Sequence, residues 1–193
     1  MVLPNTLLFP HSLLPLFIFE PRYREMLQWV LAEQRVFCIA QLKPGTAEAT
    51  DPGDFHQTGG LGLVRACVGH EDGTAHLVLQ GLARVRFTGF VQETPFRIAE
   101  LSELHSEPSE AADTDALVAR VLAFSAQLRA AGTPVPEAFD RQLSQLDDPS
   151  TIADIVAHAF LRDGARRQAI FDELRVAPRL RLLLRHLAAE GQS

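Results

Sequence analysis

Lysine is almost absent from this chain, which has 193 residues and 18 lysine and arginine residues in total. The one lysine, Lys43, is followed by Pro44, so the phosphate-binding motif G-x-x-x-x-G-K-[ST] does not occur. Lys43 also lies between a predicted strand and a predicted loop, without the motif context of a Ser-Lys catalytic dyad. We therefore expect neither a P-loop nucleotidase nor a lysine-dependent hydrolase.

Cysteine is scarce as well, because Cys38 and Cys67 are the only two in the sequence. Each lies within an apolar, strand-like run, which is typical of a reduced, buried thiol and leaves no disulfide framework. The motifs G-x-S-x-G, C-x-x-C and H-E-x-x-H are missing, and the seven histidines are scattered. These absences predict no catalytic residue, no metal and no cofactor.

The first 19 residues carry no charged side chain. Such an uncharged stretch suggests a signal peptide or a membrane span. Pro4, Pro10 and Pro15 would interrupt a helix there, and neither a preceding basic residue nor a small-residue cleavage site is present. We therefore predict two short strands joined by a turn, in a cytoplasmic protein without a membrane span.

Positive charge is in deficit, since the formal net charge is -6 at pH 7. Affinity for nucleic acids comes mainly from clustered lysine and arginine, so a general nucleic-acid partner is not expected. The hydrophobic content of 47% is that of a globular protein, and the length suits one large domain or two small ones.

The first half of the chain predicts a mostly β domain with one early helix over residues 22–34. The helix has Tyr23, Met26, Leu27 and Val30 at the spacing i, i+3, i+4, i+7, so one face should pack against a sheet. Strands are predicted over residues 5–9, 14–19, 36–42, 61–70, 74–91 and 96–104.

Two features of this half concern loops and turns. Residues 44–60 lose all periodicity and are rich in Gly, Pro, Thr and Asp, which predicts a long loop that is either mobile or functional. Asp72 and Gly73 suit a tight hairpin turn. In the following strand Leu77 and Leu79 should face one side and Val78 the other, and Gly81 should mark a bulge.

The second half predicts helices after a polar, acidic stretch at residues 105–115. This boundary divides the chain into a β domain at residues 1–107 and a helical subdomain at residues 112–193. The apolar stripes of the helices are Leu117, Val121, Phe124 and Leu128; Ile152, Ile155, Val156, Ala159 and Phe160; and Leu180, Leu183, Leu184 and Leu187. The fold class expected from the residues is α+β.

Three separated segments resemble the N-terminal substrate-binding domain of Lon proteases. They are LPNTLLFPHSLLPLFIFEPRYREML (3–27), GLGLVRACVGHEDGTAHLVLQGLARVRF (60–87) and DPSTIADIVAHAFLRDGARRQAIFDELRVAPRLRLLLRHL (148–187). Together they cover most of the chain in the family's order. The resemblance implies a PUA-like, mostly antiparallel β-barrel with one early helix, followed by a C-terminal helical bundle.

The function implied by the resemblance is capture of protein substrates by a stand-alone domain without ATPase or peptidase. A non-catalytic module that binds unfolded or exposed polypeptide segments, as an adaptor or a holdase, is therefore expected. The alternative, RNA or modified-nucleotide binding through the barrel, is a fold-level analogy that the acidic charge opposes. A hydrolase with an unfamiliar site is a third reading, and the sequence assigns no oligomeric state.

The binding residues predicted from the sequence are Leu13, Leu14 and Phe55, because apolar side chains in a turn and a loop have less reason to be core. Arg22 and Arg84, which match the Lon pattern, could order a loop or anchor an acidic group of a partner. The matching residues Phe9, Leu16 and Phe19 are expected in the core.

Overall fold

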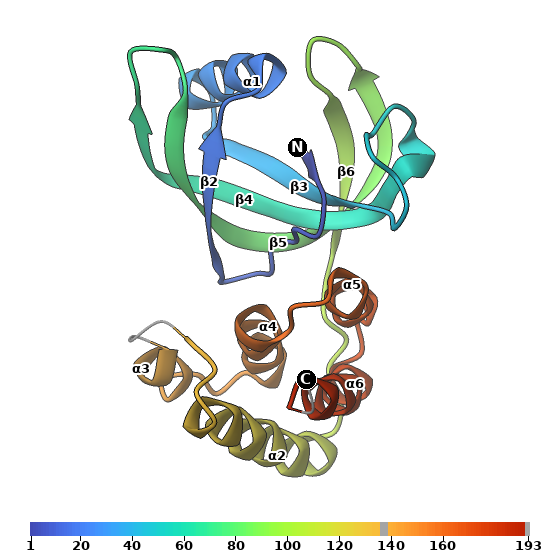
Figure 1. Cartoon of the computed structure of the whole chain (residues 1–193). Helices are drawn as coiled ribbons and strands as arrows, with labels where there is room; N and C mark the ends of the chain where they lie inside the picture. Colours follow the sequence, from blue (N-terminus) through green and yellow to red (C-terminus); the bar gives the residue numbers. More distant parts are fainter. Residues whose placement is uncertain (136–138, 192–193) are drawn as a thin grey trace. The chain divides into compact units, whose positions relative to one another are not determined.

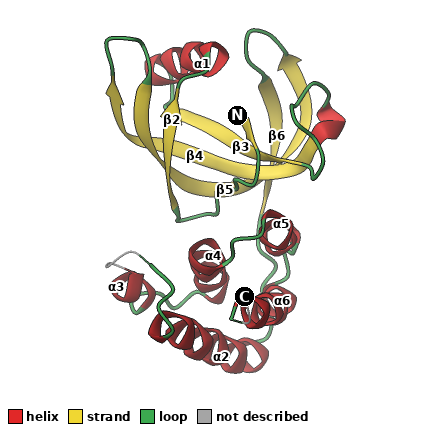
Figure 2. Ribbon diagram, in the orientation of Figure 1, coloured by secondary structure: helices red, strands yellow, loops and turns green. Residues whose placement is uncertain are grey.

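The computed structural model describes residues 1–135 and 139–191, and the chain divides into two compact units, Met1–Leu104 and His105–Ser193. The described strands all lie in the first unit with helix α1, whereas the second unit contains the helices α2 to α6 (Figure 2). The predicted α+β class is confirmed. The division into a β domain at residues 1–107 and a helical subdomain at residues 112–193 stays a prediction, and residues 192–193 lie outside the described part.

The first unit is built around two long antiparallel strands, β4 and β5, which curve strongly in Figure 1. Its elements are β1 (Val2–Leu3), β2 (Leu13–Ile18), α1 (Pro21–Ala32), β3 (Val36–Leu42), a short 3-10 turn (Pro52–Asp54), β4 (Phe55–Gly69), β5 (Ala75–Gln92) and β6 (Ile98–Leu104).

The strands pair in the order β1-β3-β4-β5-β2, and β6 joins on β5. Because β5 has 18 residues, its first part pairs with β2 and its later part with β6, so the sheet branches on β5. The pairings described form an open sheet, and the predicted closed barrel is therefore wrong. The PUA-like arrangement and the helical bundle implied by the resemblance stay predictions.

The predicted loop at residues 44–60 is too long, because β4 begins at Phe55. Phe55 pairs with Leu42, and Gly59 and Gly60 pair with Ala40 and Ile39, so the ladder of β3 and β4 continues through this segment. The sequence did not predict the first residues of β4, because glycine and many polar residues are depleted in strands. The strand at residues 36–42 is found where it was predicted.

The predicted strand at residues 5–9 is also wrong, since the first strand is Val2–Leu3. Leu7, Leu8 and Phe9 are fully buried and lie outside the strands. They cross the sheet at its glycines: a Cβ atom on Gly81 would collide with the carbonyl oxygen of Phe9. The predicted bulge at Gly81 is confirmed, because the register of β4 and β5 shifts beside it.

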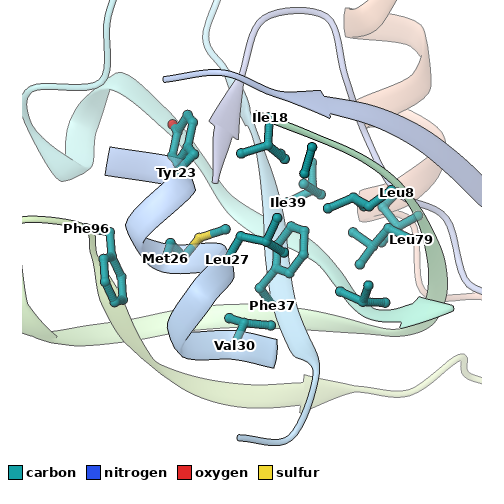
Figure 3. Packing of buried hydrophobic residues seen from close by; sticks show 13 residues of the cluster. Leu8, Ile18, Tyr23, Met26, Leu27, Val30, Phe37, Ile39, Leu79 and Phe96 are labelled. Carbon is teal, nitrogen blue, oxygen red and sulfur yellow. The ribbon is translucent and has the colours of Figure 1, made fainter. Parts of the chain in front are cut away.

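Helix α1 packs its predicted apolar face, with Tyr23, Met26, Leu27 and Val30 buried, against the sheet (Figure 3). The same cluster contains Ile39 and Leu79 from β3 and β5. Of the predicted core residues, Phe9 is buried and Leu16 is partly buried. Phe19 is 58% exposed, so its predicted place in the core is wrong. Phe19 follows the last residue of β2 on the outward side of the strand.

The second unit consists of α2 (Ala111–Ala130), α3 (Phe139–Leu143), α4 (Pro149–Phe160), α5 (Gly164–Asp172) and α6 (Val176–Glu190). Helices α2, α4 and α6 pack against one another, and Val121, Val156 and Leu183 are completely buried. Asp148 and Asp163 cap α4 and α5 by accepting hydrogen bonds from the backbone amides of Thr151 and Arg166. Among the described residues no helix is both long and apolar enough to cross a membrane.

Candidate functional site

An exposed apolar strip runs along β2 in the first unit. Alternation places Leu14, Leu16 and Ile18 toward the core, so Leu13, Pro15 and Phe17 project to the outside. Phe19, just after β2, and two exposed side chains of β4, which lies on the other side of β5, complete the strip. We call it the β2 surface: Leu13, Pro15, Phe17, Phe19, Ala66 and Val68.

The strand register brings these side chains together on one face. Phe17 pairs with His76 of β5, and His76 in turn pairs with Val68 of β4. Pro15 and Ala66 flank Val78 in the same way. The exposed fractions are 56% for Leu13, 48% for Phe17, 58% for Phe19 and 62% for Val68. Large side chains from two sequence regions therefore form one apolar area.

Aromatic contacts order one end of the β2 surface. The rings of Phe17 and Phe19 stack with 5.9 Å between their centroids, and the His76 ring lies 4.6 Å from Phe17. His76 Nδ1 and His70 Nε2 share a hydrogen bond of 2.8 Å. A recess of about 420 Å³ lies at this face and is lined in part by Pro15, Phe17 and Val68.

The backbone of β2 lies at one end of the strand order, and among the described strands it pairs with β5 alone (Figure 1). Edge strands present unpaired amide and carbonyl groups to which another extended chain can add. Pro15 has no amide hydrogen, and proline at a sheet edge limits uncontrolled strand pairing. Binding at this edge would therefore depend mainly on the apolar side chains.

Two predicted binding residues, Leu13 and Leu14, are neighbours that face opposite ways. Leu13 belongs to the β2 surface, whereas Leu14 packs against the core cluster around α1. Phe55 is 1% exposed, so the expectation that it is an exposed loop residue is wrong. Its ring packs edge-on against Phe87 and Phe90, with centroids 6.1 and 6.0 Å away, and lines an apolar cavity of about 180 Å³.

The predicted arginines are held by their surroundings. The guanidinium of Arg22 forms an ion pair of 2.8 Å with Glu20 and lies over the ring of Tyr23, 4.7 Å from its centroid. Arg84 is only 3% exposed, and its backbone pairs with Gly60 and Leu104. The structure therefore does not bring Arg22 and Arg84 to the β2 surface as a common anchor.

Sequence reasoning missed Phe17, Phe19 and Val68. A signal for the first two was present, because the run LLPLFIF has no polar position and both faces of that strand are apolar. A half-buried strand should alternate apolar and polar residues. Val68 had no such signal, since its place beside Phe17 depends on the register of two further strands.

The Cys38 thiol is poorly suited to nucleophilic chemistry. Burial raises the pKa of the Cys38 thiol to about 11, so the thiol is protonated at neutral pH and is a poor nucleophile. Within residues 1–135 and 139–191, no group of three or more His, Cys, Asp or Glu side chains is placed to hold a metal ion.

Residues 1–189 match the family model of the ATP-dependent protease La (LON) substrate-binding domain. The chain belongs to this family. Similar proteins include a Lon protease from Desulfosudis oleivorans, 24% identical over 188 residues, and Lon protease 2 from Herpetosiphon aurantiacus, 26% identical over 186 residues. These alignments cover 97% and 94% of this chain but 23% of each relative.

Solved structures of Lon N-terminal domains share the fold. The domain from the Mycobacterium avium complex superposes with a TM-score of 0.73 at 18% identity, covering 97% of this chain and 96% of that one. The domain from Xanthomonas campestris gives a TM-score of 0.67 at 16% identity, with 95% of both chains covered. The family supports a substrate-binding module, and it lends no support to the RNA-binding alternative.

Proposed function

We propose that this chain is a non-catalytic module that captures extended, apolar polypeptide segments on the β2 surface. The observation that carries the proposal is the row of Leu13, Phe17 and Phe19 exposed along an edge strand, with Val68 beside it. A holdase or an adaptor needs such a surface, because it must hold a client whose apolar residues are not yet buried. The substrate-binding family supports a protein client.

The area available on the two phenylalanines is large enough to matter. An aromatic side chain buries roughly 150–250 Å² when it is fully covered, so the exposed halves of Phe17 and Phe19 together offer about 200 Å². At about 25 cal/mol per Å², covering them contributes up to about 5 kcal/mol of binding free energy. Ordering a flexible client offsets part of this gain.

The chemistry of the β2 surface favours polypeptide over nucleic acid. None of its six residues is charged, whereas phosphate binding depends on lysine and arginine. An unfolded chain supplies apolar side chains that can pack against this surface and a backbone that can lie beside an edge strand.

The test compares the affinity of a fluorescent, permanently unfolded client for the wild-type chain and for the variant Phe17→Ser/Phe19→Ser. We expect the Kd to rise at least tenfold, which corresponds to about 1.4 kcal/mol, as measured by fluorescence anisotropy. The melting temperature should change little, because both rings are about half exposed. The same variant should lose the ability to slow aggregation of a heat-denatured client.

Val91→Ser is the matched control, since Val91 is 67% exposed near the end of β5 and lies outside the β2 surface. It should leave the Kd unchanged. Unaltered binding by a folded Phe17→Ser/Phe19→Ser variant would place the site elsewhere. Client binding that is competed by RNA and lost in moderate salt would favour the nucleic-acid alternative instead.

A further inference from the structure

A second recess, separate from the β2 surface, lies between α1 and the hairpin of β4 and β5 and has a volume of about 420 Å³. Helix α1 contributes Arg24, Leu27, Gln28 and Leu31 at the spacing i, i+3, i+4, i+7, which places them along one face. The hairpin contributes the opposite wall, and the turn lies beside α1 in Figure 1. We call this recess the hairpin groove.

The hairpin groove has a cation toward each end of its helical wall. Arg24 lies in the first half of α1, and Arg35 follows the end of the helix at Ala32. Their backbones are hydrogen-bonded, but neither guanidinium forms a hydrogen bond or an ion pair among the residues that the structure describes. Such unpaired cations stand out in a chain whose net charge is -6.

Arg24 is positioned by the turn of the hairpin. Its guanidinium lies against Gly73, which has a φ of +78°, and a Cβ atom at that position would collide with it. Asp72 lies in the same turn, and its carboxylate already accepts hydrogen bonds from the amide and hydroxyl of Thr74. Those bonds lower the pKa of Asp72, with a smaller contribution from the charge of Arg24. No acidic side chain lines the groove among the described residues.

The floor between the cations is apolar. Leu27 and Ala75 are buried there, and Leu31 and Cys67 are partly buried. Free phosphate would leave this floor uncovered, and two arginines are too few to hold a nucleic acid at physiological salt. An acidic peptide with apolar residues between its carboxylates would pair with both arginines and cover the apolar floor.

We propose that the hairpin groove binds an acidic, extended polypeptide segment whose two carboxylates pair with Arg24 and Arg35. From Arg24 to the end of α1 the helix advances about 12 Å, at about 1.5 Å per residue. An extended chain advances about 3.3 Å per residue, so the acidic residues lie about four positions apart. The groove is an interaction surface for an acidic partner and is independent of apolar capture on β2.

The experiment measures binding of the fluorescent peptide GELALEG to the full chain by anisotropy, with GQLALQG as the uncharged comparison. Two surface ion pairs contribute modestly, so we expect GQLALQG to bind at least fivefold more weakly. The variant Arg24→Gln/Arg35→Gln should weaken GELALEG by a similar factor and abolish the difference between the peptides. Raising the salt concentration should reduce binding of GELALEG more than that of GQLALQG.

The matched control is Arg65→Gln/Arg120→Gln, which removes two exposed arginines outside the hairpin groove and should leave the affinity unchanged. The variant Phe17→Ser/Phe19→Ser should also bind GELALEG normally, which separates this proposal from the function of the β2 surface. Equal binding of the two peptides by the wild-type chain, or no binding of either, would overturn the proposal whatever the variants do. A short RNA that displaces GELALEG with higher affinity would also overturn it.

Discussion

Arg179 is a fully buried cation in the helical unit, and it ties four segments together. Its guanidinium donates to the carbonyl oxygens of Glu173 and Leu174 at 2.7 and 3.1 Å and to the hydroxyls of Ser150 and Ser106 at 2.8 and 3.0 Å. The carboxylate of Asp154, 3.4 Å away, balances the charge. Removing one partner of a buried pair leaves the other uncompensated.

We predict that Arg179→Met lowers the free energy of unfolding by about 3–5 kcal/mol, because Asp154 would remain buried without its counter-charge. Urea titration followed by circular dichroism measures the change. The control is Arg175→Met, since Arg175 forms an exposed ion pair with Glu173 and such pairs contribute about 0–1 kcal/mol. Equal losses in the two variants would show that burial of Arg179 is not the cause.

The sequence predicted single residues well only where local pattern decides their environment. The α1 face was found from its spacing, whereas Phe55 was misplaced because its burial depends on Phe87 and Phe90 from the distant strand β5. Arg179 was missed, although it lies three residues after Val176 and four before Leu183 and therefore shares the apolar face of α6. A charged residue at such a position indicates a buried network.

At the scale of elements, the crossing of residues 7–9 over the sheet depends on glycine. Gly81 donates its amide to the carbonyl oxygen of Ser12 at 2.9 Å and accepts from the amide of His11 at 2.9 Å. The crossing chain comes so close that a side chain at Gly81 would meet the backbone of Phe9 and Pro10. The glycine therefore permits the close approach as well as the bulge.

We predict that Gly81→Ala lowers the free energy of unfolding by about 1–3 kcal/mol, the usual cost of overpacking a core. Gly69→Ala is the matched control in β4, since a Cβ atom there would meet nothing within 4 Å. Differential scanning calorimetry measures both variants. A Gly81→Ala chain as stable as the Gly69→Ala chain would contradict the close approach of the two segments.

Element types were predicted more successfully than the way in which the strands connect. The strand at β3 and the hairpin turn at Gly73 follow from local composition, and both are present. The sequence did not show that β5 pairs with three other strands, because the pairing of one long strand along different parts is not encoded in local periodicity. The closed barrel was therefore expected where an open, branched sheet exists.

At the scale of the whole molecule, the β unit presents two surfaces of different chemistry. The β2 surface is apolar and uncharged, and the hairpin groove carries Arg24 and Arg35 over an apolar floor. The family resemblance seen in the sequence is confirmed by the match over residues 1–189, and it indicated protein substrates. It did not indicate which residues bind, since exposure arises from strand register and edge position.

The most direct test of the central claim is site-specific photo-crosslinking to an unfolded client. Benzoylphenylalanine replaces Phe17 on the β2 surface in one variant and the more exposed control Val91 in another. We predict that the probe at position 17 crosslinks the client efficiently and that the probe at position 91 gives only background. Efficient crosslinking at position 91 with none at position 17, in folded variants, would contradict capture on the β2 surface.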